Sequence, residues 1–138
     1  MFSEGYESGK TALSSVNQVM RDDLTDSELA VLGRSEEAKI RAAVAERPLT
    51  PLTTLLRLAS DEAPSVRAGV ARNPRSDLPI EVREALATDK DITVQLALLR
   101  CPTVPEAIVR KMGRSWNREV AAAAKKRIAN PVYQLRLT

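Results

Sequence analysis

A segment of about 26 residues recurs along this 138-residue chain, and this repeat constrains the fold more than any isolated motif does. Its core follows the pattern V-R-x-x-V-A-x-N-P, and copies occupy residues 40–48, 66–74 and, in degenerate form, 94–102. A fourth copy begins at Val120, so successive copies start 26, 28 and 26 residues apart. A fixed period of this size is typical of stacked supersecondary elements rather than of one globular core. The sequence therefore predicts a domain of stacked repeats.

Each repeat is expected to contain two short helices. The first has apolar residues at its opening position and four residues later, as in Val66 and Val70, and these positions share one helix face. The residue three after the opening position is small in every copy, and Gly69 is the smallest of them. Glycine lowers helix propensity by about 1 kcal/mol relative to alanine, so its presence indicates close packing against a neighbouring backbone.

Prolines mark both helices of a repeat. The proline that closes the pattern ends the first helix, because the residue before a proline avoids helical dihedral angles. A second proline, at Pro51, Pro79 or Pro105, precedes the next apolar stretch and is expected at the first helical position. Thr50 is predicted to be the N-cap residue of the helix that follows it. Short polar residues five positions before each opening residue are predicted to cap the following helix: Ser35, Asp61, Asp89 and Ser115.

The repeat pattern also predicts domain boundaries. A half-repeat precedes the first full copy, with Thr25 in the place of the proline. The last repeat is longer, and its run 125–127 of lysine and arginine is expected to form the polar outer face that a terminal repeat needs. Residues 11–138 are expected to form a single α-solenoid domain. The segments in order are a disordered tail over 1–10, an N-terminal cap over 11–24 with a helix over 11–23, repeats over 25–131 and a C-terminal tail over 132–138.

The recurring residues resemble those of the leucine-rich repeat variant family. The pattern V-R-x-x-V-A-x-N-P followed by L-x-x-L-A-x-D is similar to that family's repeat over roughly residues 25–131, although Gln95 and Cys101 depart from it. The resemblance implies an all-α fold, a right-handed α-solenoid of short paired helices related to HEAT and armadillo repeats, in which α-helices alternate with short or 3₁₀ helices. One type in that family carries a cysteine-ligated iron–sulfur cluster in an added N-terminal segment. This sequence has no such cysteine cluster, so no cofactor is expected.

The composition argues against several classes of function. The chain has no histidine and a single cysteine, so the commonest general base and any cysteine-based metal site are missing. Neither a glycine-rich phosphate loop nor a nucleophile elbow occurs. No run of about 18 apolar residues predicts a membrane span, and the polar N-terminus does not resemble a signal peptide. We therefore expect a non-enzymatic, cytoplasmic protein that holds no metal.

Charge is distributed unevenly along the chain. Residues 1–62 carry 11 acidic and 7 basic side chains, whereas residues 63–138 carry 7 acidic and 14 basic ones. Such a gradient can steer an acidic partner, although a solvated basic face is the simpler alternative. The position six after each opening residue changes from Glu46 to basic residues, which would form a row on stacked repeats. The basic candidates for a binding surface are Arg72, Arg100 and Lys126 in this row, together with Arg110, Lys111, Arg114 and Arg118.

Four residues allow both a structural and a functional interpretation. Arg41 and Arg67 follow their opening residues, and packing over a neighbouring helix with the guanidinium on a carboxylate or carbonyl explains them better than ligand binding does. Cys101 is better explained as a small, half-buried residue than as a reactive thiol. Trp116 fits two interpretations equally, as an exposed anchor for a partner or as a wedge that fills the gap between repeats.

Stacked repeats present an extended surface, so binding of another protein is the leading functional hypothesis. The alternative is a nucleic-acid-binding module that uses the basic C-terminal half, since phosphate contacts need rows of arginine and lysine. Against this alternative, the stacking aromatics of single-strand binding are absent from most of the chain. A third hypothesis, a HEAT-like DNA glycosylase, is disfavoured because the chain is short and has few aromatic residues for a base pocket.

Overall fold

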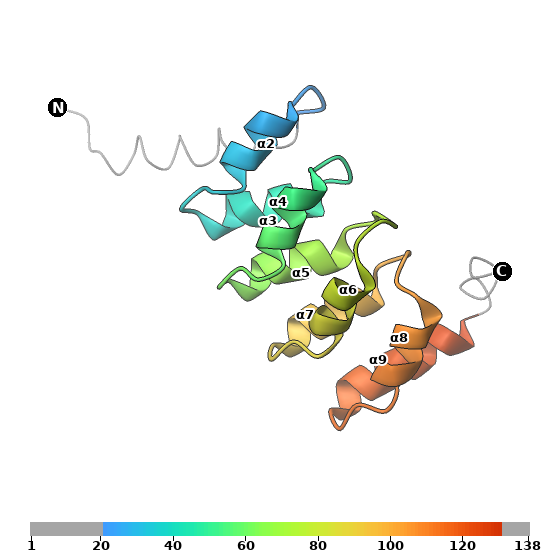
Figure 1. Ribbon diagram of the computed structural model, residues 1–138. Coiled ribbons are helices and arrows are strands. Elements are labelled where there is room, and N and C mark those ends of the chain that lie inside the picture. The colour runs from blue at the N-terminus through green and yellow to red at the C-terminus, as the bar shows by residue number, and fades with distance from the viewer. Residues whose placement is uncertain (1–20, 131–138) are drawn as a thin grey trace. The chain divides into compact units, whose positions relative to one another are not determined.

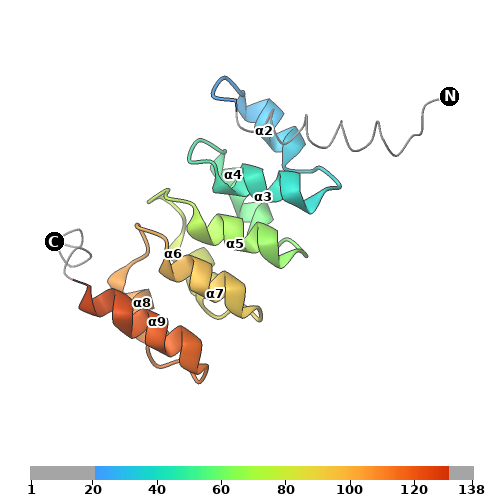
Figure 2. The same ribbon diagram turned by 180° about the vertical axis from the view of Figure 1, so that it is seen from behind.

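The computed structural model describes residues 21–130, which form eight α-helices (Figure 1, and from behind in Figure 2). No strand occurs within that range, so the all-α prediction is confirmed, and none of these helices is long and apolar enough to cross a membrane. The shorter helices are α-helical, and no 3₁₀ helix is found among the described residues. The helices are α2 (Asp26–Leu32), α3 (Ala38–Glu46), α4 (Leu52–Leu58), α5 (Pro64–Arg72), α6 (Ile80–Ala87), α7 (Ile92–Leu99), α8 (Glu106–Met112) and α9 (Arg118–Ala129).

Three predictions fall wholly or largely outside the described residues. They are the tail over 1–10, the cap over 11–24 with its helix, and the C-terminal tail over 132–138. The half-repeat that follows the cap is described. Thr25 caps α2, because its Oγ1 accepts a hydrogen bond of 3.1 Å from the Glu28 N–H. Thr25 therefore starts a helix where the other repeats use a proline.

The prolines lie one position earlier than predicted. Pro51, Pro79 and Pro105 are the N-cap residues of α4, α6 and α8, with ψ between 140° and 142°, and the helices begin one residue later. Each proline contributes its carbonyl as the first helical acceptor, as in the 3.1 Å bond from the Leu55 N–H to Pro51, while its fixed φ suits the extended N-cap equally well. The prediction for Thr50 is wrong. Its side chain is fully buried and donates a 2.7 Å hydrogen bond back to the Val44 carbonyl.

A polar side chain closes the turn before α3, α5, α7 and α9 in the same way. It accepts a hydrogen bond from the backbone N–H two residues later, at the N-cap or the residue directly before the helix. The predicted capping residues therefore act on the turn, three positions before the first residue of the helix. The four bonds are Ser35 to Glu37 at 3.2 Å, Asp61 to Ala63 at 2.9 Å, Asp89 to Asp91 at 2.9 Å and Ser115 to Asn117 at 3.1 Å.

In the first three copies, the side chain after the opening residue holds the same turn from the other side. Arg41 donates to the Ser35 carbonyl at 2.8 Å, and Arg67 donates to the Asp61 carbonyl at 2.7 Å. Gln95 replaces the arginine in the degenerate repeat and still donates to the Asp89 carbonyl at 2.5 Å. Arg67 is only 6% exposed. The structural interpretation of Arg41 and Arg67 is therefore confirmed.

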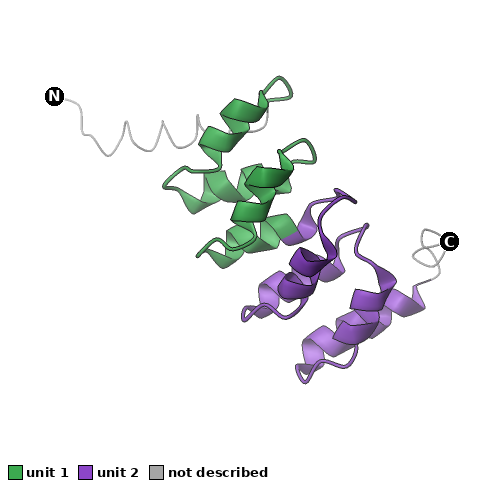
Figure 3. Ribbon diagram, viewed as in Figure 1, with its two compact units in different colours: residues 1–70 green, residues 71–138 purple. Residues whose placement is uncertain are grey.

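The chain is divided into two compact units, residues 1–70 and residues 71–138 (Figure 3). In the first unit, α3 packs against both α2 and α4. The core of this unit is formed by buried aliphatic side chains, which come from one face of each helix as the repeat pattern predicts: Leu29, Ile40, Val44, Leu55, Leu58 and Val66.

Besides the aliphatic core, an ion pair between Arg41 and Asp61 stabilises the first unit. The guanidinium makes a bidentate contact with the carboxylate, through Nε at 2.9 Å and Nη2 at 3.1 Å. Both side chains are 11% exposed, so the pair is largely removed from water. Asp61 follows α4, and Arg41 lies in α3. The pair therefore ties the turn that precedes α5 to the preceding long helix.

In the second unit the helices form two packed pairs. Helix α6 packs against α7, and α8 packs against α9. The equivalent helices of the two pairs also pack against each other, α6 with α8 and α7 with α9. The buried residues of these helices are Leu86, Val94, Leu98, Ile108, Val109, Val120 and Ala124. This arrangement places helices α6 and α8 side by side (Figure 1).

The side chain seven residues after the opening residue reaches back to an earlier segment of the chain. Arg47 donates a 2.6 Å hydrogen bond to the Arg21 carbonyl, and Arg127 donates to the Leu99 carbonyl. Arg127 is only 8% exposed, so the expectation that residues 125–127 together form a polar outer face is wrong for this residue. The Arg127 guanidinium points toward the interior because its acceptor, the Leu99 carbonyl, belongs to α7. Lys125 and Lys126 are exposed.

Candidate partner-binding groove

Cys101 occupies the same reach-back position in the second unit. It is 1% exposed rather than half-buried, and its Sγ lies 3.2 Å from the Asn73 carbonyl oxygen. A small side chain at this place fills space between two repeats and leaves no path for a reagent. The geometry favours the packing interpretation of Cys101 over the reactive-thiol one.

This burial gives a direct prediction for thiol chemistry. A disulfide reagent such as DTNB should modify Cys101 about a hundredfold or more slowly in the native chain than in denaturant, because reaction requires local opening. The measurement is the rate of thionitrobenzoate release with and without urea. Equal rates in the two conditions would mean that the thiol is accessible in the native state.

Trp116 lies in the turn between α8 and α9 and is 93% exposed. A tryptophan that fills a gap between repeats would be buried, so the wedge interpretation is wrong. The same turn position in the other repeats holds Glu36, Glu62 and Lys90, all exposed. Trp116 therefore places a large aromatic surface where the other repeats place a charge, and such a residue is suited to anchor a partner.

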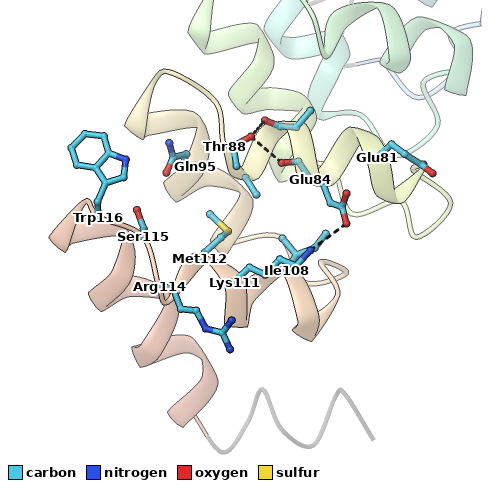
Figure 4. Close-up of a pocket in the computed structure, with 12 residues that line it drawn as sticks. Glu81, Glu84, Thr88, Gln95, Ile108, Lys111, Met112, Arg114, Ser115 and Trp116 are labelled. Atoms are coloured by element: carbon cyan, nitrogen blue, oxygen red, sulfur yellow. Dashed lines mark hydrogen bonds and ion pairs between the residues drawn. The ribbon is translucent and has the colours of Figure 1, made fainter.

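A groove of about 650 Å³ lies beside Trp116 in the second unit. Its walls come from one face of α6, one face of α8 and the turn after α8, with Gln95 of α7 between them (Figure 4). The lining residues follow helical spacing, with 81, 84, 85 and 88 on α6 and its C-cap and 108, 111 and 112 on α8. Apolar atoms of Ala85, Ile108 and Met112 contribute to its lining.

The charges of the groove are divided between its walls. Glu81 and Glu84 come from α6, whereas Lys111 and Arg114 come from α8 and the turn after it (Figure 4). Lys111 Nζ lies 3.8 Å from Glu84 Oε1, an exposed pair across the groove. Glu81 and Arg114 have no ion pair or hydrogen bond of their side chains among residues 21–130. The groove therefore offers one unpaired anion and one unpaired cation to a ligand.

The structure brings together three of the eight predicted binding residues. Lys111, Arg114 and Trp116 line the groove. Arg110 is exposed but pairs with Glu106 of its own helix at 2.6 Å. The remaining predicted residues are exposed and do not line the groove: Arg72, Arg100, Arg118 and Lys126.

Sequence reasoning missed the groove residues Glu84, Gln95 and Met112. Gln95 and Met112 sit at repeat positions that the pattern assigns to structure, and Gln95 does hold the turn. Two small residues of α6, Ala85 and Ala87, also line the groove, but residues two apart do not share one helix face, so their spacing gave no signal.

In comparisons with known proteins, no protein-family model, curated protein or solved structure matches this chain. The resemblance to leucine-rich repeat variants therefore rests on the repeated residues alone.

Proposed function

We propose that the chain is a right-handed α-solenoid of repeats of about 26 residues, and that it is a non-enzymatic module that binds another protein through the groove beside Trp116. The repeated turn, the inward arginines and the paired packing of α6 to α9 support the solenoid. The observation that carries the binding role is a tryptophan left 93% exposed at the edge of an apolar groove. Tryptophan and arginine are among the residues most enriched at the energetic centres of protein interfaces.

The groove favours a protein over a nucleic acid. A phosphate backbone that runs the length of this groove would pass Glu81, whose carboxylate has no ion pair among the described residues, and like charges at close range oppose binding. Among the described residues, Trp116 is the one aromatic side chain that lines the groove, whereas single-strand binding uses several stacking aromatics. A polypeptide can instead place apolar atoms on Ala85 and Trp116 and carry its charges only where the groove complements them.

The experiment is affinity purification from the native host with nuclease-treated extract and three baits. The wild-type chain and Leu49→Ala are expected to capture the same protein, because Leu49 is also an exposed apolar residue, at 72%, but lies in the first unit. Trp116→Ala should reduce that capture about tenfold or more, in keeping with the loss of an interface anchor. Capture that is unchanged by Trp116→Ala, or recovery of nucleic acid alone from untreated extract, would refute the proposal.

A further inference from the structure

The surroundings of Trp116 are basic. Arg114 and Arg118 lie two residues to either side of it, and Glu119 follows Arg118. Both arginines are exposed, and neither has a side-chain hydrogen bond or ion pair among the described residues 21–130. Lys90 holds the equivalent position in the turn between α6 and α7, but it lies between Asp89 and Asp91, so that turn adds no net positive charge. The positive charge beside the aromatic ring therefore comes from Arg114 and Arg118.

The negative charge of the groove, on Glu81 and Glu84, is partly neutralised. Glu84 is paired with Lys111, and Glu81 lies near the start of α6, away from Trp116 (Figure 4). The second unit as a whole is also basic, with 13 lysine and arginine residues against 7 aspartate and glutamate residues over 71–138. Charge complementarity therefore favours negative charge on the ligand at the Trp116 end.

The apolar lining of the groove sets a second requirement for the ligand, namely an apolar side chain. Ala85 is exposed and presents apolar atoms to the groove, whereas Ile108 and Met112, at 2% and 4% exposure, contribute little open surface. A ligand that bears only charge would leave this surface wet. An apolar side chain of the ligand would bury it together with one face of the Trp116 ring.

Building on the proposed function, we propose that the bound segment of the partner is a short acidic peptide with a large apolar side chain at its centre. The apolar side chain lies against Trp116 and the apolar lining of the groove, and the flanking carboxylates face Arg114 and Arg118. The chemistry of the partner is thus inferred from two unpaired cations beside Trp116 and from that lining.

Trp116 is the only tryptophan of the chain, so its fluorescence reports on this site alone. The full chain is titrated at low ionic strength, where charge contacts are least screened, with a short capped peptide in which Leu-Phe is flanked on both sides by pairs of acidic residues. Excitation is at the red edge of tryptophan absorption, which avoids the two tyrosines. The expected result is a saturable shift of emission to shorter wavelength as the ring leaves water.

Three comparisons make the titration specific. Peptides with lysine in place of the acidic residues, or with Gly-Gly in place of Leu-Phe, should bind about tenfold more weakly or worse. Arg114→Glu should weaken binding of the acidic peptide about tenfold, whereas Arg34→Glu, an exposed arginine of the first unit, should leave it unchanged. Glu81→Gln should bind the acidic peptide at least as well as the wild type does.

Equal binding of the lysine peptide, no spectral shift with any peptide, or tighter binding of a single-stranded oligothymidylate would each overturn the inference. These outcomes are separable from failure of the proposed function. If the peptides fail while Trp116→Ala still abolishes capture of a host protein, the groove binds protein of a different chemistry. If capture is also independent of Trp116, the proposed function fails with the inference.

Discussion

Replacing Asp61 by alanine is expected to lower the free energy of unfolding by about 3 kcal/mol. The substitution removes a bidentate pair whose members are both 11% exposed, and it leaves the Arg41 guanidinium without its counter-charge. Breaking a fully buried pair in this way costs about 3–5 kcal/mol, and Arg41 keeps the carbonyls of Ser35 and Glu36 as acceptors, which reduces that loss to about 2. The Ala63 N–H also loses its 2.9 Å acceptor, which adds about 1 kcal/mol.

The chain offers a matched control in Asp77→Ala. Asp77 also pairs with an arginine, Arg75, at 2.6 Å, but the aspartate side chain is 54% exposed. Exposed pairs contribute about 0–1 kcal/mol, so this variant should stay close to the wild type. Urea denaturation followed by helical circular dichroism measures both variants. Equal destabilisation by the two substitutions would mean that the Arg41–Asp61 pair is no more important than a surface pair.

The same carboxylate should make stability depend on pH. Burial acts to raise the pKa of Asp61, but the hydrogen bonds from Arg41 and Ala63 and the positive charges of Arg41 and Arg67 outweigh it, so the pKa lies below its ordinary value. A lowered folded pKa means that the stabilisation is complete above the unfolded pKa of about 3.9 and is lost as pH falls through the folded value. The difference in unfolding free energy between wild type and Asp61→Ala should therefore be constant near neutrality and shrink in acid. A difference that persists unchanged in strong acid would contradict the assignment.

The repeat in the sequence predicted the helices and their inward residues because both depend on local spacing. The arginine that follows Ile40 or Val66 has a fixed relation to its own turn, so its acceptor could be predicted from one repeat alone. The predicted positions of the prolines were wrong by one residue, because the fixed φ of proline is compatible with both the N-cap and the first helical position. The prediction for Arg127 was wrong because its acceptor, the Leu99 carbonyl, lies in another repeat. The repeat pattern contains no information about the distance between those two groups.

The groove could not be predicted from spacing because its size depends on side chains of two helices at once. The exposure of Trp116 could have been predicted, since the aligned residues Glu36, Glu62 and Lys90 are all charged and charged residues are rarely buried. The position of Trp116 beside the groove could not have been predicted, because the groove exists only when α6 packs against α8. Function was the least predictable property, since the repeated positions describe how the helices pack and the ligand-facing residues vary between repeats.

Replacing Gly69 by valine should destabilise the first unit by about 3 kcal/mol, an effect comparable to that of Asp61→Ala. A Cβ atom at Gly69 would lie 2.9 Å from the Ala45 Cβ and 3.0 Å from the Ala42 carbonyl oxygen. Both atoms belong to α3, and neither can rotate away, so α5 must shift. Overpacking of this kind costs about 1–3 kcal/mol for added methyl groups, and the branched valine falls at the upper end.

Alanine at the same position separates packing from helix propensity. Gly69→Ala gains about 1 kcal/mol of propensity and meets the same two atoms of α3, so a net loss of about 1 kcal/mol is expected. Gly113→Ala is the control, because its nearest contact outside the preceding turn is the Lys125 Cγ at 3.8 Å, and it should change stability by no more than about 0.5 kcal/mol. All three variants are compared by urea denaturation. If Gly69→Val unfolds at the wild-type urea concentration, the small residue is not required for α3 and α5 to approach, and the physical reason given for a glycine inside this helix fails.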